Sequence, residues 1–315
     1  MSSEATTSFA CFGGTVTVHV GGDAGVSAEE AASAARTRLL DANRRFSRFL
    51  PESELSRLNL DRRFTVPVSR PMLELAAAAR RAGFLSGGLV DATMLDDIER
   101  AGYRESRAEG MELPMAAGAP AGRHRRKPAA ASPRRGWSLI AVDRRAGTVS
   151  RPSGLRIDSG GIAKGLLADA VAATLGRHST YAVDCCGDIR IGGAGRRPRA
   201  VLVASPDSGE PLRTLAIEDG AVATSGIAKR SWIGPDGEAA HHLLDPSTGA
   251  PAFTGVVQVT AQAPTAFLAE VYSKQALLSG PELAPARLPF GGVLVLDDGA
   301  VEVVEPDRAE LVGSR

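Results

Sequence analysis

The alternation of hydrophobic and polar residues along the chain predicts many short strands between a few long helices. Residues 15–20 (TVTVHV) are rich in β-branched residues, which predicts an opening strand. The same pattern, bounded by Gly and Pro, predicts further strands over residues 137–142, 147–150, 155–158, 181–186, 200–204, 214–217, 256–261 and 292–296.

Helical spacing of apolar residues marks three long helices. Ser27 and Glu30 form a capping box at the start of a run that extends to about Arg45. Pro71 suits the first turn of a second helix, which ends at Gly87 and Gly88, and a third covers residues 265–278. A further helix follows the glycine turn near residue 160. The succession predicts an α+β fold with mostly antiparallel sheets and three long helices.

One stretch interrupts this order. Between residues 102 and 136 the periodicity disappears, and residues 123–135 (RHRRKPAAASPRR) are basic and rich in Pro and Ala. This composition favours a disordered loop over a nucleic-acid site. The sequence therefore predicts a single domain over residues 1–315 with a flexible basic insertion at residues 105–136.

Charge and cysteine usage narrow the class of protein. The 37 Lys and Arg residues nearly balance the 36 Asp and Glu residues, so composition indicates no nucleic-acid or membrane-surface partner. Three cysteines, Cys11, Cys185 and Cys186, favour no disulfide framework and fit a reducing compartment. The N-terminus lacks a signal-peptide pattern, and no apolar run is long enough for a membrane span. A cytoplasmic location is predicted.

Four segments carry candidate chemistry. In residues 158–169 (DSGGIAKGLLAD), Asp158 ends a strand, glycines let backbone approach a ligand, and the following helix start, with Lys164, suits a phosphate. In residues 241–249 (HHLLDPSTG), His242 precedes an Asp-Pro turn and is a candidate general base. Ser225 and Asp91 add a hydroxyl and a carboxylate beside glycines. The alternative for each segment is an ordinary turn or helix cap.

Seven segments, taken in order, resemble the ApbE family, the FAD:protein FMN transferases. They are residues 46–59 (FSRFLPESELSRLN), 88–93 (GLVDAT), 158–169, 186–189 (CGDI), 224–226 (TSG), 242–249 (HLLDPSTG) and 269–274 (AEVYSK). The resemblance covers roughly residues 12–297. It implies an ApbE-like, T-fold-like α+β domain with FAD in a cleft.

The resemblance also implies site residues and an activity. The positions that would contact FAD are Gly13, Phe49, Leu89, Val90, Asp91, Asp158, Lys164, Ser225 and Leu244, and His242, Asp158 and Lys164 would be catalytic. The implied reaction moves FMN from FAD to a Thr or Ser hydroxyl of an acceptor protein and releases AMP. An FAD pyrophosphatase and a non-catalytic FAD-binding protein are the alternatives.

A magnesium ion on the FAD phosphates is implied as well, held at the positions of Gly161, 270 and 274. The family has Asp and Thr at the last two positions, whereas this chain has Glu270 and Lys274. A protonated Lys cannot ligate a metal. An ordinary i,i+4 ion pair worth about 0.2 to 0.5 kcal/mol is the structural alternative. Catalysis with fewer metal ligands, catalysis without metal, and no catalysis all stay open.

Overall fold

The computed structural model describes residues 4–106 and 126–307. Within these residues the main sheet has eight strands, and every neighbouring pair is antiparallel. In spatial order they are β1 (Glu4–Cys11), β2 (Gly14–Gly21), β6 (Thr180–Cys185), β7 (Asp188–Gly192), β10 (Gly220–Gly226), β13 (Val256–Ala263), β14 (Gly292–Leu296) and β15 (Val301–Val304).

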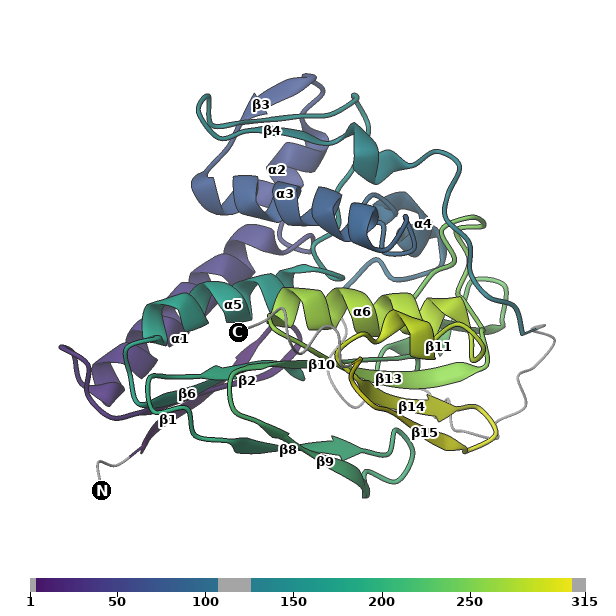
Figure 1. The fold of residues 1–315 in the computed structure, drawn as a ribbon. Helices are drawn as coiled ribbons and strands as arrows, with labels where there is room; N and C mark the ends of the chain where they lie inside the picture. Colours follow the sequence, from purple (N-terminus) through teal and green to yellow (C-terminus); the bar gives the residue numbers. More distant parts are fainter. Residues whose placement is uncertain (1–3, 107–125, 308–315) are drawn as a thin grey trace.

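Three helices lie across one face of this sheet (Figure 1): α1 (Ala28–Phe46), α5 (Ala163–Leu175) and α6 (Ala266–Ser279). The predicted capping box starts α1, because the Ser27 hydroxyl accepts from the Glu30 N–H at 3.2 Å while the Glu30 carboxylate accepts from the Ser27 N–H at 3.0 Å. Helix α6 is buried along almost its whole length, between the sheet and the elements above it. A helix in such a place is normally apolar all round, so its two charged residues stand out.

A second layer lies above these helices (Figure 1). It contains α2 (Glu54–Leu60), α3 (Arg70–Leu85), α4 (Leu95–Arg100), the short helix η1 (Gly136–Leu139) and a small sheet of β3 (Thr65–Pro67), β5 (Thr148–Ser150) and β4 (Ala141–Asp143). The remaining elements are the hairpins β8 (Arg199–Ala204) with β9 (Pro211–Ile217) and β11 (Ser231–Ile233) with β12 (Ala239–His241), and η2 (Pro285–Arg287).

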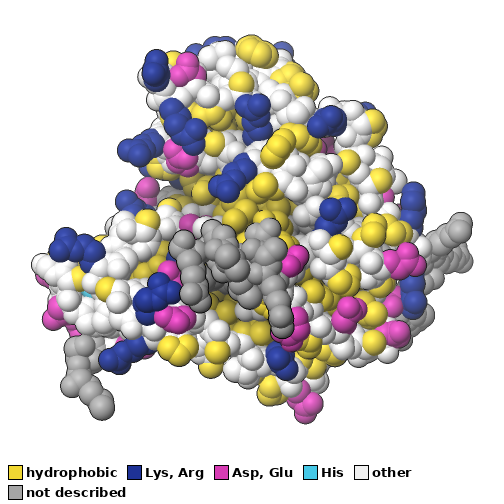
Figure 2. Space-filling model, viewed as in Figure 1, with side chains coloured by type: hydrophobic (Ala, Val, Ile, Leu, Met, Phe, Trp, Pro, Cys, Tyr) yellow, Lys and Arg dark blue, Asp and Glu magenta, His cyan; other side chains and the backbone are white. Residues whose placement is uncertain are grey.

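The surface carries charges of both signs over the face shown in Figure 2, and hydrophobic side chains gather in a hollow between the upper and lower layers. Among the described helices, none combines the length and apolar composition needed to cross a bilayer.

The α+β fold with antiparallel sheets is confirmed. Two strand predictions were wrong. Residues 137–142 begin as the 3-10 helix η1 and become a strand only at Ala141, because Trp137 is buried against α3 rather than paired in a sheet. Residues 155–158 form no strand; the Asn59 side chain, not a neighbouring strand, bonds both backbone groups of Ile157.

Residues 107–125 of the predicted insertion lie outside the described residues. Its C-terminal part contacts the fold: the Lys127 N–H bonds the Phe253 carbonyl at 3.0 Å, and the Ala129 N–H bonds the Leu278 carbonyl at 2.8 Å. That part of the segment therefore lies against the end of α6.

Candidate functional site

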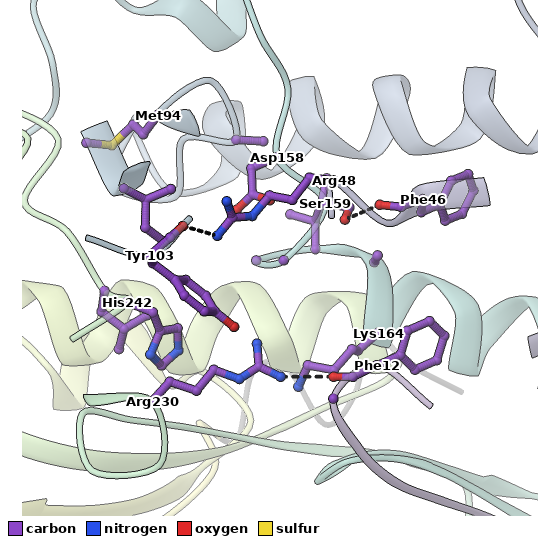
Figure 3. Close-up of a pocket in the computed structure, with 18 of the residues that line it drawn as sticks. Phe12, Phe46, Arg48, Met94, Tyr103, Asp158, Ser159, Lys164, Arg230 and His242 are labelled. Carbon is purple, nitrogen blue, oxygen red and sulfur yellow. Dashed lines mark hydrogen bonds and ion pairs between the residues drawn. The ribbon is translucent and has the colours of Figure 1, made fainter. Parts of the chain in front are cut away.

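A cavity of about 370 Å³ opens between the second layer and helices α5 and α6 (Figure 3). Its wall combines the end of α1, the loop before α4, the glycine turn before α5, the residues before β11 and after β12, and one side of α6. A largely apolar cavity of this size with a few convergent polar groups is the usual form of a small-molecule site.

The glycine turn is held from three directions. Asn59 of α2 donates to the Ile157 carbonyl and accepts from the Ile157 N–H, both at 2.8 Å. The next N–H, of Asp158, bonds the Ala92 carbonyl at 2.7 Å, and the Ser159 hydroxyl bonds the Phe46 carbonyl at 2.8 Å. These bonds fix where the Asp158 carboxylate enters the cavity.

Arg48 connects Asp158 to the aromatic wall. Its Nε lies 3.4 Å from the Asp158 carboxylate, and its guanidinium lies over the rings of Phe49 and Tyr103 at 4.3 and 4.7 Å. Tyr103 in turn stacks on Trp232, with 5.3 Å between ring centroids. One face of the Phe49 ring is therefore covered by Arg48, and a planar ligand stacking on Phe49 would use the other face or displace the guanidinium.

Asp91 lies in the same wall, in the loop after α3. Its carboxylate accepts from the Thr93 N–H at 2.8 Å and from the Thr93 hydroxyl at 2.6 Å. Burial raises the pKa of Asp91 in spite of these bonds. The carboxylate is thus both a turn-forming group and a cavity-lining group.

Two lysines and an arginine from separate elements line the cavity floor. Lys164, in the first turn of α5, forms an ion pair with the buried Asp188 of β7 at 2.7 Å. Burial acts to lower the pKa of Lys164, but the charges of Asp188 and Glu270 raise it above its ordinary value. Arg230, before β11, donates to the Phe12 carbonyl at 3.0 Å, as Figure 3 shows.

Lys274 is the third cation, and its partner is Glu270 one turn earlier on α6. The Lys274 ammonium lies 2.9 Å from Glu270 Oε1, and the Gly165 N–H of α5 donates to Glu270 Oε2 at 2.9 Å. Burial acts to raise the pKa of Glu270, yet Lys274 and Lys164 hold it below its ordinary value. Glu270 is fully buried, whereas Lys274 reaches the cavity.

The expected magnesium site does not fit these residues. Both carboxylate oxygens of Glu270 already accept hydrogen bonds, and an ammonium occupies the position from which a hydroxyl would ligate. No group of three or more His, Cys, Asp and Glu side chains is placed to hold a metal ion in residues 4–106 and 126–307. Glu270 and Lys274 thus form the i,i+4 ion pair that was the alternative to a metal site, and this pair is buried rather than on the helix surface.

His242 lies across the cavity from the glycine turn, beside Arg230 in Figure 3. Its buried Nδ1 has no hydrogen-bond partner among the described residues. Burial, followed by the charge of Arg230, holds the pKa of His242 well below its ordinary value. The ring is therefore neutral at neutral pH, and its Nδ1 is covered by the protein.

The structure brings most of the predicted site residues to this one cavity. Those that line it are Gly13, Phe49, Leu89, Val90, Asp91, Asp158, Gly161, Lys164, His242, Leu244 and Lys274. Ser225 does not line it; its buried hydroxyl pairs with Ser273 of α6 at 2.8 Å. Glu270 is also away from the cavity surface and acts on it through the two lysines, Lys274 by a hydrogen bond and Lys164 by charge.

Three residues of the candidate site were not singled out from the sequence: Arg48, Tyr103 and Asp188, the partner of Lys164. Arg48 and Asp188 lie inside two of the motifs, at residues 46–59 and 186–189. The motifs therefore indicated that these positions belong near the site but did not indicate what the two side chains contact. Tyr103 comes from the start of the aperiodic stretch and is placed only by its contacts with Arg48 and Trp232. No sequence pattern marks it.

Comparison with known proteins places this geometry in a family. The ApbE family matches residues 12–290. The FAD:protein FMN transferase of Treponema pallidum (strain Nichols) is 33% identical over 156 residues, which are 45% of this chain and 43% of that protein. That of Salmonella typhimurium is 26% identical over 259 residues, 79% of this chain and 71% of that protein. The alignment to the Treponema protein thus spans less than half of that protein's length.

Solved structures share the fold. The ApbE protein of Thermotoga maritima superposes with a TM-score of 0.76 at 24% identity, covering 98% of this chain and 99% of that one. The flavin transferase ApbE of Vibrio cholerae gives a TM-score of 0.71 at 22% identity, with the same coverage. Since the family match extends over most of the sequence and the fold agrees with it, this chain belongs to the ApbE family.

Proposed function

We propose that this chain transfers FMN from FAD to a Thr or Ser hydroxyl of an acceptor protein and releases AMP. The observation that carries the proposal is the convergence of the glycine turn, His242 and three cations on one cavity. The relatives from Treponema and Salmonella are named FAD:protein FMN transferases. Their likeness to this chain supports the same activity here.

The cavity offers each part of FAD a matching group. Lys164, Arg230 and Lys274 carry positive charge on the floor, where the two phosphates of FAD would find charge-assisted hydrogen bonds. The face of the Phe49 ring that Arg48 does not cover presents aromatic surface for a planar ring. Asp158, oriented by Arg48, supplies an acceptor for ribityl or ring donors.

The proposed step is a phosphoryl-type displacement. The acceptor hydroxyl oxygen forms a bond to the FMN phosphorus, and the bond from that phosphorus to the bridging oxygen of AMP breaks. His242, a neutral ring that lines the cavity, takes the hydroxyl proton, and AMP leaves with the electron pair. The floor cations stabilise charge that develops on the phosphoryl oxygens. No step is assigned to magnesium, because Glu270 and Lys274 do not form a site for it.

The test is incubation of the chain with FAD and Thr- and Ser-containing peptides, read by mass spectrometry of the peptides and chromatography of the nucleotides. A peptide that gains the mass of an FMN ester, with one AMP for each, supports transfer. FMN and AMP without modified peptide would identify a pyrophosphatase instead. Intact FAD that stays bound to the protein would identify a flavin-binding protein and sink the transferase proposal.

A further inference from the structure

We propose that Lys274 replaces a divalent cation at the FAD pyrophosphate, so that this chain binds FAD without metal. The inference deepens the proposed function and depends on it only for the identity of the ligand. Its first support is the position of Lys274. The residue lies on a buried helix, where a lysine is rare unless it forms an ion pair. Of the two residues in the ion pair, Lys274 is the one that lines the cavity.

Glu270 positions the ammonium rather than a metal. One carboxylate oxygen accepts from the Gly165 N–H of α5, and the other accepts from Lys274. An ammonium has three N–H donors, and Glu270 takes one of them. Because Lys274 lines the cavity, its two remaining N–H groups can donate to phosphate oxygens.

The lysine side chain also packs on the glycine turn. A Cβ added to Gly161 would lie 3.6 Å from Lys274 Cε and 4.0 Å from Cδ, so the lysine stem passes directly over the turn. The position whose carbonyl was expected to hold magnesium therefore faces a lysine side chain. These distances are ordinary van der Waals contacts, so the stem packs against the turn, and the ammonium lies at the end of the stem.

The charges on the cavity floor favour a pyrophosphate and oppose a dication. Lys164 and Lys274 are balanced by Asp188 and Glu270, and Arg230 adds one positive charge. A divalent cation near Glu270 would lie close to the Lys274 ammonium, and like charges at such a separation repel strongly where water is excluded. A pyrophosphate brings two negative charges to the same place and is attracted by all three cations.

The experiment measures FAD affinity by flavin fluorescence, once with EDTA and once with excess MgCl₂. For the unmodified chain we expect the same dissociation constant in both conditions. Lys274→Thr removes the ammonium and supplies a hydroxyl; we expect its FAD affinity in EDTA to fall by roughly tenfold to a hundredfold, the usual range for losing a charge-assisted hydrogen bond. Added MgCl₂ restores part of that loss, because the carboxylate of Glu270 is freed.

Two controls separate this effect from loss of fold or of net charge. Lys127→Thr removes the same charge from an exposed side chain outside the cavity and is expected to leave FAD affinity unchanged. Lys274→Arg keeps the cation and is expected to retain more affinity in EDTA than Lys274→Thr. Thermal unfolding of each variant checks that it folds.

Several outcomes would overturn the inference. FAD affinity of the unmodified chain that collapses in EDTA and returns with MgCl₂ would show a metal site. Equal affinity of Lys274→Thr and the unmodified chain in EDTA would show that the ammonium does not contact the phosphates, and no FAD binding in either condition would remove the ligand altogether. Metal-independent FAD binding without transfer supports the inference and contradicts the proposed function. FMN transfer together with FAD binding that requires magnesium supports the proposed function and contradicts the inference.

Discussion

The carboxylate of Asp169 on α5 accepts a hydrogen bond from the backbone N–H of Phe267 at 2.9 Å, at the first turn of α6. Its other oxygen accepts from the Ala266 N–H at 2.8 Å. In the opposite direction, Glu270 of α6 accepts a hydrogen bond from the Gly165 N–H in the first turn of α5. The two helix starts are therefore tied by two carboxylates, and this tie sets the position of Lys274 over the glycine turn.

Removing the first of these carboxylates should loosen α6. Asp169→Ala leaves two buried N–H groups of the first turn without their acceptor, and loss of a helix-capping acceptor typically costs about 0.5 to 2 kcal/mol. We expect the free energy of unfolding, from urea denaturation, to fall by about this amount. Glu52→Ala, an exposed carboxylate between α1 and α2, serves as the control and should stay within about 0.5 kcal/mol. Equal losses for both variants would contradict the tie.

The parts of the fold that local chemistry specifies were predictable. Helix α1 begins at its capping box and α3 at its Ser-Arg-Pro start, because those signals act over a few residues. Strand β1 was missed because its sequence, EATTSFAC, is polar and small and becomes a strand only by pairing with β2. Its Thr and Ser side chains face partners such as Thr17 across the hairpin, which no local pattern encodes.

The site was predictable as segments and not as contacts. The motifs named the glycine turn and His242, and the fold brings them to one cavity. Ser225 instead faces Ser273 of α6. Side chains alternate between the two faces of a strand, and the sequence of β10 does not tell which face is turned toward α6 and which toward the cavity. The single domain over residues 1–315 and the cytoplasmic location stay predictions.

Asn59 should matter for both stability and ligand binding. It makes two buried hydrogen bonds with the backbone of Ile157, next to Asp158. Asn59→Ala strands both backbone groups at about 1 to 3 kcal/mol each, so we expect a loss of several kcal/mol in urea denaturation and weaker FAD binding. Ser56→Ala, on the same helix, keeps the backbone bonds of its turn and should change unfolding by about 0.5 kcal/mol or less. An Asn59→Ala protein as stable as Ser56→Ala would rule out this role.

The stability of the chain should depend on pH through Asp188. Burial raises its pKa from 3.8 to about 6, although Lys164 and Lys274 oppose the change and Glu270 adds to it. A carboxyl whose pKa is raised by folding favours the folded state most when it is protonated, below pH 3.8, and this contribution is lost as pH rises to about 6. Relative to Asp188→Asn, the unmodified chain should lose stability between these pH values in urea denaturation. A difference between the two proteins that does not vary with pH would contradict the raised pKa.

His242 should affect the rate of transfer more than the binding of FAD. His242→Ala removes the proposed proton acceptor, and we expect the rate of FMN transfer to fall by about 10² to 10⁴, with little change in FAD affinity. Because the pKa of His242 lies well below its ordinary value of 6.5, the imidazole stays neutral as the pH falls through that value. The transfer rate of the unmodified chain should therefore hold steady at pH 6.5 and decline only at more acidic pH. A rate that already falls by half at pH 6.5, or a His242→Ala protein that transfers FMN as fast as the unmodified chain, would mean that another group accepts the proton.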